Sequence, residues 1–169
     1  MARSKVSKKK SSSGMNRPLA FLGGLLVIIS VGLSLVLDFF GWWNYSIILG
    51  HENWINAFGG LNWNDNIENL YSDDALIELM PGVIALFGAI LILIRKQATG
   101  IIGALLVFVA IGIFINNLDT FVSLNLFLDL NNASIYWWNS GTFYCYMGYG
   151  LIMGGLGAVF GLIGSLLKN

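Results

Sequence analysis

The sequence has few of the side chains that most enzymes and metalloproteins depend on. Its 169 residues include one cysteine, Cys145, and one histidine, His51. A single cysteine excludes an intramolecular disulfide and every metal site built from several cysteines. The chain also lacks a Gly-rich phosphate loop, an HExxH, a CxxC and a Ser/His/Asp arrangement. We therefore expect no cofactor, no bound metal and no catalytic activity.

Charge is also scarce, and hydrophobic residues dominate. Charged residues make up 11% of the chain and hydrophobic residues 56%, whereas about a quarter of an ordinary soluble domain is charged. This composition indicates an integral membrane protein and gives no reason to expect a nucleic-acid partner. The expected partners are the lipid bilayer and other membrane subunits, including further copies of the chain.

Four apolar stretches reach or approach the ~20 residues that a helix needs to cross a bilayer. They lie at about 18–43, 75–94, 100–116 and 142–167. The first is too long for the core of a signal peptide, so we interpret it as a retained helix. The predicted fold is an all-α integral membrane protein with four transmembrane helices in an antiparallel bundle. Residues 1–17 are predicted to be a disordered basic tail, residues 18–169 the membrane domain, and residues 44–74 and 117–141 two structured outer loops.

The charges predict an orientation. The lysines and arginines occupy three places on one side of a four-span chain: Arg3, Lys5, Lys8, Lys9, Lys10 and Arg17 in the tail, Arg95 and Lys96 between the second and third spans, and Lys168 at the end. Basic segments favour the cytoplasmic side, so both termini are predicted to be cytoplasmic and the plasma membrane is the expected location. The tail either attracts anionic lipid or only sets the topology.

The tripeptide Trp-Trp-Asn occurs twice, at 42–44 and 137–139. In the predicted topology, both copies lie at the outer surface. Tryptophan favours the headgroup region of a bilayer, so Trp42, Trp43, Trp137 and Trp138 are predicted to form an outer interface belt. An aromatic cage for a cationic ligand is the alternative.

The outer loops carry weaker signals. The spacing of Trp54, Ile55 and Phe58 fits a short interfacial helix. Leucines alternate with other residues over 124–130, which is typical of a strand, although an extension of the third span fits equally well. Asn44 and Asn132 match the acceptor pattern for N-glycosylation.

Two carboxylates are candidates for an outer cation site. Counted from the basic anchors at ~1.5 Å per residue, Asp38 and Glu78 lie near the outer surface rather than at the midplane. Glu78 precedes Pro81 by about one turn, and that proline frees a backbone carbonyl. We expect a simple interfacial carboxylate here, with a cation site as the alternative.

Glycines line one face of the last span. Gly150, Gly154, Gly157 and Gly161 recur at steps of four, three and four. Small residues let helices approach closely in lipid, so these four are predicted to form a helix-packing surface. We favour a contact within the bundle, and a contact with another subunit is the alternative. Gly23, Gly32, Gly82, Ala85, Gly88 and Gly112 are candidate partner positions on the other spans.

The four-span topology and the segment GGLNW at 59–63 resemble claudin-like tetraspan proteins. The hallmark of that family is Gly-Leu-Trp followed by a cysteine pair in the first outer loop. Here Asn62 separates Leu61 from Trp63 and the cysteine pair is missing, so we do not assign the chain to the family.

These features predict a non-catalytic membrane protein: an accessory, scaffolding or adhesion component that acts through its outer loops and helix contacts. A small transporter or channel subunit with an acidic outer vestibule is the alternative. A third hypothesis, a membrane enzyme that uses outer residues such as Glu78 and His51, lacks a recognisable catalytic motif.

Overall fold

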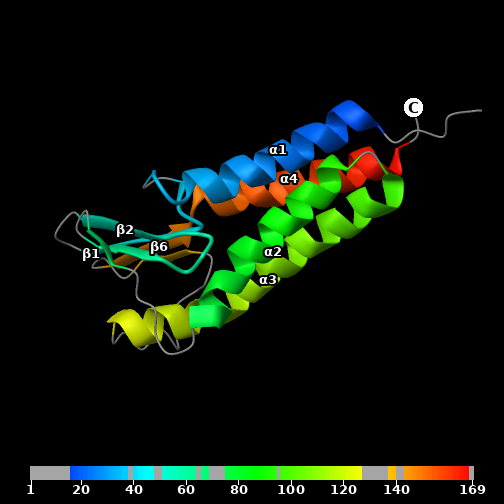
Figure 1. Cartoon of the computed structure of the whole chain (residues 1–169). Coiled ribbons are helices and arrows are strands. Elements are labelled where there is room, and N and C mark those ends of the chain that lie inside the picture. The colour runs from blue at the N-terminus through cyan, green and yellow to red at the C-terminus, as the bar shows by residue number, and fades with distance from the viewer. Residues whose placement is uncertain are drawn as a thin grey trace, which may run out of the picture.

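Helices make up most of the part of the chain that the structure describes. The computed structural model describes residues 16–37, 40–47, 51–63, 66–68, 75–94, 96–126, 137–139 and 143–167. Within these ranges there are four helices: α1 (Arg17–Leu33), α2 (Ala75–Leu93), α3 (Gln97–Leu126) and α4 (Tyr149–Leu166). They run alongside one another, with a β-sheet at one end of the bundle (Figure 1).

Two of the four helices contain segments long and apolar enough to cross a membrane. These segments are Gln97–Leu118 of α3 and Tyr149–Leu166 of α4. The apolar stretches Arg17–Leu33 and Leu79–Leu93 are shorter. Of the predicted fold, the structure therefore confirms a mostly helical chain in which two of the four described helices are long and apolar enough to cross a membrane.

The predicted helix ends differ in accuracy. The second span, predicted at 75–94, is α2 within one residue, and α3 extends the third span to 30 residues and ends at Leu126. The first and fourth spans were predicted too long. α1 ends at Leu33, Trp43 begins a strand, and residues 143–147 form a strand before α4. A short apolar run does not distinguish a helix from a buried strand.

The all-α class and the interfacial helices predicted for the first loop must be corrected, because the structure contains a sheet. The described strands are β1 (Trp43–Ile47), β2 (His51–Ile55), β3 (Leu61–Trp63), β4 (Asn66–Glu68), β5 (Trp137–Asn139) and β6 (Phe143–Met147). Trp54 and Ile55 therefore lie in a strand. Of the stretch 124–130, residues 124–126 belong to α3, and the rest lies outside the described residues.

The sheet joins segments from both predicted outer loops. Its strand order is β4-β3-β2-β1-β6-β5, and the neighbouring strands are antiparallel. Two adjacent strands, β1 and β6, come from opposite halves of the chain and pair from Trp43↔Met147 to Ile47↔Phe143. Because β1 follows α1 and β6 precedes α4, this strand pair continues the α1–α4 helix pair into the sheet.

The helices pack most extensively as two pairs, α1 with α4 and α2 with α3. Glycines bring the backbones together in both. A Cβ built on Gly157 would lie 2.7 Å from the carbonyl oxygen of Gly23, and one on Gly88 would lie 2.6 Å from that of Gly103. Real Cβ atoms essentially never come that close to other atoms. Close backbone approach through small residues is how helices pack in lipid.

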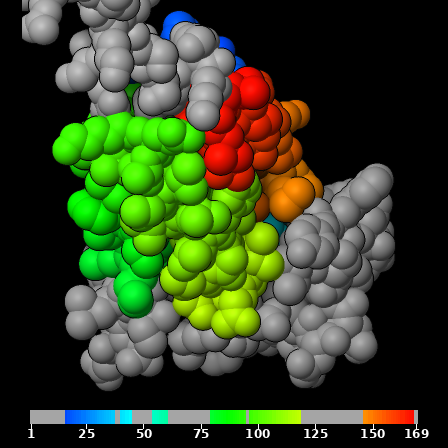
Figure 2. Space-filling view, turned by 90° about the vertical axis from the view of Figure 1, so that its right-hand side faces the viewer, coloured from blue at the N-terminus to red at the C-terminus, as the bar shows by residue number. Residues whose placement is uncertain are grey.

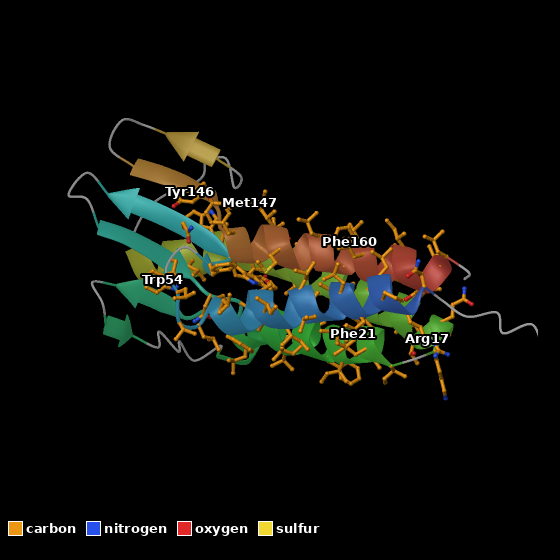
Figure 3. The ribbon with its side chains drawn as sticks, turned by 90° about the horizontal axis from the view of Figure 1, so that it is seen from above. Arg17, Phe21, Trp54, Tyr146, Met147 and Phe160 are labelled. Atoms are coloured by element: carbon orange, nitrogen blue, oxygen red, sulfur yellow. The ribbon has the colours of Figure 1, made fainter. Side chains whose placement is uncertain are left out.

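The two ends of the bundle differ in character. At the end away from the sheet, the N–H of Asn16 donates to the carbonyl oxygen of Leu167, which ties the start of α1 to the end of α4. Arg17 lies at this end, whereas Trp54 and Tyr146 lie at the sheet end (Figure 3). The outer surfaces of α2, α3 and α4 meet along one face of the molecule (Figure 2). Exposed apolar side chains on these helices include Val83, Phe87, Ile90, Ile102, Leu105, Leu156 and Ile163.

Candidate functional site

The glycine face predicted on the last span lies against α1 and the segment that follows it. Gly150, Gly154, Gly157 and Gly161 are all buried. A Cβ on Gly150 would collide with the carbonyl oxygen of Phe40, and one on Gly154 would lie 3.0 Å from Ser30 Oγ. A Cβ on Gly161 would lie 2.8 Å from the side chain of Ile92 on α2. Side chains larger than hydrogen would therefore separate α4 from two neighbouring helices.

Trp42 connects the sheet to three helices. Its side chain is fully buried. The indole Nε1–H donates to Ser30 Oγ at 3.2 Å, and the Ser30 hydroxyl donates to the carbonyl oxygen of Gly150 at 2.6 Å. The indole ring also packs edge-on against Phe114 of α3, with ring centroids 5.1 Å apart. We call Trp42, Ser30, Gly150 and Phe114 the junction cluster.

The turn between β2 and β3 also contacts the helices. The Ala57 N–H donates to Ser34 Oγ at 3.2 Å, just beyond the end of α1, and Ala57 is fully buried. Within the turn, Asn56 Oδ1 accepts from the N–H groups of Phe58 and Gly60, and Gly59 adopts a φ of 74°, which suits glycine. A Cβ on Gly82 would collide with the Phe58 ring. The turn is therefore held between α1 and α2.

Gly41, just before β1, and Gly148, just after β6, let these two segments of the chain pass close to each other. A Cβ on Gly148 would collide with the carbonyl oxygen of Gly41. The Gly148 N–H donates to the Trp42 carbonyl oxygen at 3.0 Å, and the Gly150 N–H donates to that of Gly41 at 3.2 Å. These bonds fix where the α1–α4 pair becomes the β1–β6 pair.

Trp42 and Trp43 do not lie where headgroup anchors would lie. They are 0% and 3% exposed, respectively, so the protein interior, and not the bilayer surface, surrounds their rings. Both Trp-Trp-Asn copies instead take part in the sheet on either side of β6, since Asn44 and Trp137 both pair with Tyr146. The side chains of Trp137 and Trp138 lie outside the described residues.

Asn44 is a poor glycosylation acceptor in this fold. Its side chain is 3% exposed and lies in β1, between Trp54 and Tyr146 of the neighbouring strands. A glycan on Asn44 is not compatible with that burial. Asn44 Oδ1 is also buried without a hydrogen-bond partner among the described atoms. Asn132, the other predicted acceptor, lies outside the described residues.

The proposed cation site at Asp38 and Glu78 stays a prediction, because the structure does not describe both side chains. Asp38 lies outside the described residues, and of Glu78 only the backbone is described, in α2 one turn before Pro81. No group of three or more His, Cys, Asp or Glu side chains suited to a metal occurs in the part of the chain that the structure describes. The junction cluster itself contains no titratable side chain, so it can fix geometry but cannot transfer a proton.

Sequence reasoning did not identify several residues of this region. Ser30 and Ser34 are isolated polar residues in an apolar stretch, which is a usable signal because hydroxyl groups in lipid need partners. Gly164 continues the α4 glycine series by one further step of three, and a Cβ on it would lie 2.8 Å from Ala20 Cα. Gly88 was among the candidate partner positions, but its contact Gly103 on α3 was not.

No family model, no curated protein and no solved structure matches the chain.

Proposed function

We propose that the chain is a multi-pass membrane protein whose four helices cross the plasma membrane and carry the sheet on the outer side. Two helices long and apolar enough to cross a bilayer support this proposal. The sheet lies at the opposite end of the bundle from Arg17, and the basic residues of the sequence come before or at the start of α1, between α2 and α3, and after α4. Under the positive-inside rule, the termini are then cytoplasmic.

Within this topology, we propose a non-catalytic role as an accessory, scaffolding or adhesion component. The observation that carries this proposal is the buried connection between sheet and helices through the junction cluster. A sheet fixed at several points to a bundle presents its outer surface in a constant orientation relative to the membrane. Rigid presentation favours recognition of another molecule, because little ordering free energy is lost on binding.

The transporter or channel alternative depends on Glu78 and Asp38. Glu78 belongs to α2, and the nearby Pro81 is buried within that helix. A pore subunit would need polar side chains that face an axis shared by several copies, whereas a scaffold protein needs no such arrangement. The two functions therefore differ in whether the reconstituted protein conducts solutes.

Topology is tested by cysteine labelling in intact cells, after Cys145 is replaced by serine. Ser12→Cys should be protected from a membrane-impermeant maleimide, whereas Asn64→Cys should react. The reverse pattern would overturn the orientation.

The role is tested in two further experiments. A photo-crosslinking residue at Asn64 should capture a defined partner on intact cells, or vesicles carrying the protein should adhere to one another. Gly148→Val should abolish either result because it disrupts the sheet connection, and the exposed-site control Leu156→Ala should preserve it. Solute flux into proteoliposomes that disappears in Glu78→Gln would instead establish the transporter.

A further inference from the structure

Two helical glycines differ from the others, because they face outward and have no close neighbour. A Cβ built on Gly32 of α1 or on Gly112 of α3 would have no atom of the described residues within 4 Å, apart from its own helix. Glycine weakens a helix relative to alanine. At Gly23, Gly88, Gly103 and Gly157, close helix contact offsets that loss. Gly32 lies in the last turn of α1, where the loss matters less, but Gly112 lies in the middle of α3.

Gly112 belongs to an exposed stripe along α3. Ile102, Leu105, Val109, Gly112 and Asn116 follow one another at steps of three and four, and all five are exposed. This 3-4 spacing is the repeat with which parallel helices pack into one another. Figure 2 shows that α3 (yellow-green) reaches the molecular surface between α2 and α4. The stripe therefore combines a knob-and-hole spacing with a glycine at which a second backbone can approach closely.

Asn116 is a second and independent observation on the same face. Its side chain is exposed near the end of the apolar segment Gln97–Leu118, and its one described hydrogen bond is a long contact of 3.5 Å to the Asn117 side chain. A carboxamide both donates and accepts hydrogen bonds. Two asparagines facing each other therefore satisfy one another, and such pairs specify helix register in parallel coiled coils.

We propose that α3 is the contact through which two copies of this chain form a symmetric dimer in the membrane. Two copies inserted in the same direction have parallel α3 helices, and a two-fold axis along the bilayer normal then places identical residues opposite each other at equal depth. Gly112 meets Gly112, and Asn116 meets Asn116. A different partner protein would need its own matching small residue and amide at these depths. The inference rests on the proposed insertion of α3 into the bilayer, and does not depend on the role of the sheet.

The test uses the full chain in liposomes, with donor- and acceptor-labelled copies mixed at increasing protein-to-lipid ratios. Energy transfer should show a concentration-dependent dimer. Gly112→Leu should weaken dimerisation at least ~tenfold, because leucine holds the backbones apart. Asn116→Leu should weaken it about threefold, the effect of an average hydrogen bond between membrane helices.

Gly32→Leu is the matched control. Gly32 is also exposed with open space around it, and it lies fifteen residues after the first residue of its helix, as Gly112 does. Neither leucine meets an internal obstacle, so both variants should keep the melting temperature of the monomer, and only Gly112→Leu should lose the dimer. In a Cys145→Ser background, Val109→Cys should crosslink between copies under oxidation, and Leu25→Cys on α1 should not.

Three outcomes would overturn the proposal: a monomer at every ratio, a dimer unaffected by Gly112→Leu, or equal losses in Gly112→Leu and Gly32→Leu. Flotation of the vesicles separates this failure from that of the proposed function. A chain that does not float with lipid contradicts membrane insertion itself, whereas a floating monomer contradicts only the dimer.

Discussion

The α1–α4 and α2–α3 pairs use the same packing device but differ in what they support. In each pair, glycines let one backbone touch the other, at Gly23 and Gly157 in the first and at Gly88 and Gly103 in the second. The α1–α4 pair continues into the paired strands β1 and β6 of the sheet, whereas α2 and α3 follow one another in the chain with only a short connection between Leu93 and Gln97. Glycine packing alone therefore does not determine the role of a pair.

What distinguishes the α1–α4 pair is its buried hydrogen bonding at the sheet end. Ser30 of α1 bonds to the backbone of α4 and to Trp42. We therefore expect perturbations of the α1–α4 pair to disturb both helices and sheet, and perturbations of the α2–α3 pair to disturb mainly the helices. The following predictions test that difference, from the largest expected effect to the smallest.

Trp42→Ala should lower the free energy of unfolding by about 3–5 kcal/mol, as expected for removal of a fully buried aromatic ring. Thermal unfolding in mild detergent measures the loss, and limited proteolysis should show cleavage within the sheet. Phe87→Ala is the control from the other pair, because its ring is exposed on α2 and its loss should cost less than about 1 kcal/mol. Equal effects would show that Trp42 does not connect the two parts.

Gly157→Leu should destabilise the protein by roughly 3 kcal/mol, because the new side chain must push against the Gly23 backbone. Gly103→Leu should cost a similar amount through Gly88. Protease sensitivity of the sheet should rise only in Gly157→Leu, and the exposed-site variant Val159→Leu should be mild. Equal sensitivity in both glycine variants would remove the distinction between the pairs.

Ser30→Ala should cost about 2 kcal/mol, since the Trp42 indole N–H is left buried without its acceptor. Ser165→Ala is the matched control. Its hydroxyl is equally buried but donates only to Gly161 of its own helix, so we expect a change within about 1 kcal/mol. The same melting-temperature assay compares them, and a larger loss in Ser165→Ala would contradict the importance of the junction.

Glu78→Gln should change stability by no more than about 0.5 kcal/mol, as for an interfacial surface substitution. Calcium should leave the melting temperature of both proteins unchanged. A calcium-dependent rise in the wild type that is absent from Glu78→Gln would reveal a cation site in the α2–α3 pair and would give that pair a function of its own.

The sequence predicts α2 well and the end of α1 poorly, for a physical reason. Polar residues bound the α2 run on both sides, with Asp73 and Asp74 before it and Arg95 after it. After Leu33 the chain stays mostly apolar up to Trp43, although helix α1 has ended, and this stretch ends in Trp42 and Trp43, which are buried in protein. Burial by protein and burial by lipid select the same residue types, so hydropathy alone does not separate them.

The candidate site was less predictable than the helices. The α4 glycine series is a local pattern and could be identified directly, but the sequence did not determine which small residues on the other helices contact it. Gly23 lies opposite α4, whereas Gly32 and Gly112 face outward. The bond between Ser30 and Gly150 joins residues 120 positions apart, and no local pattern encodes which partners such distant residues choose.

The pairing of β1 with β6 has a consequence for biosynthesis. Trp43 pairs with Met147, about a hundred residues later in the chain. At ~5–20 residues synthesised per second, β1 and the glycine-bearing face of α1 wait on the order of 5–20 s for their partners. During that interval, the open strand edge is a template for pairing with another nascent chain. Correct assembly of this protein therefore depends on protection of its first half until the last helix has been made.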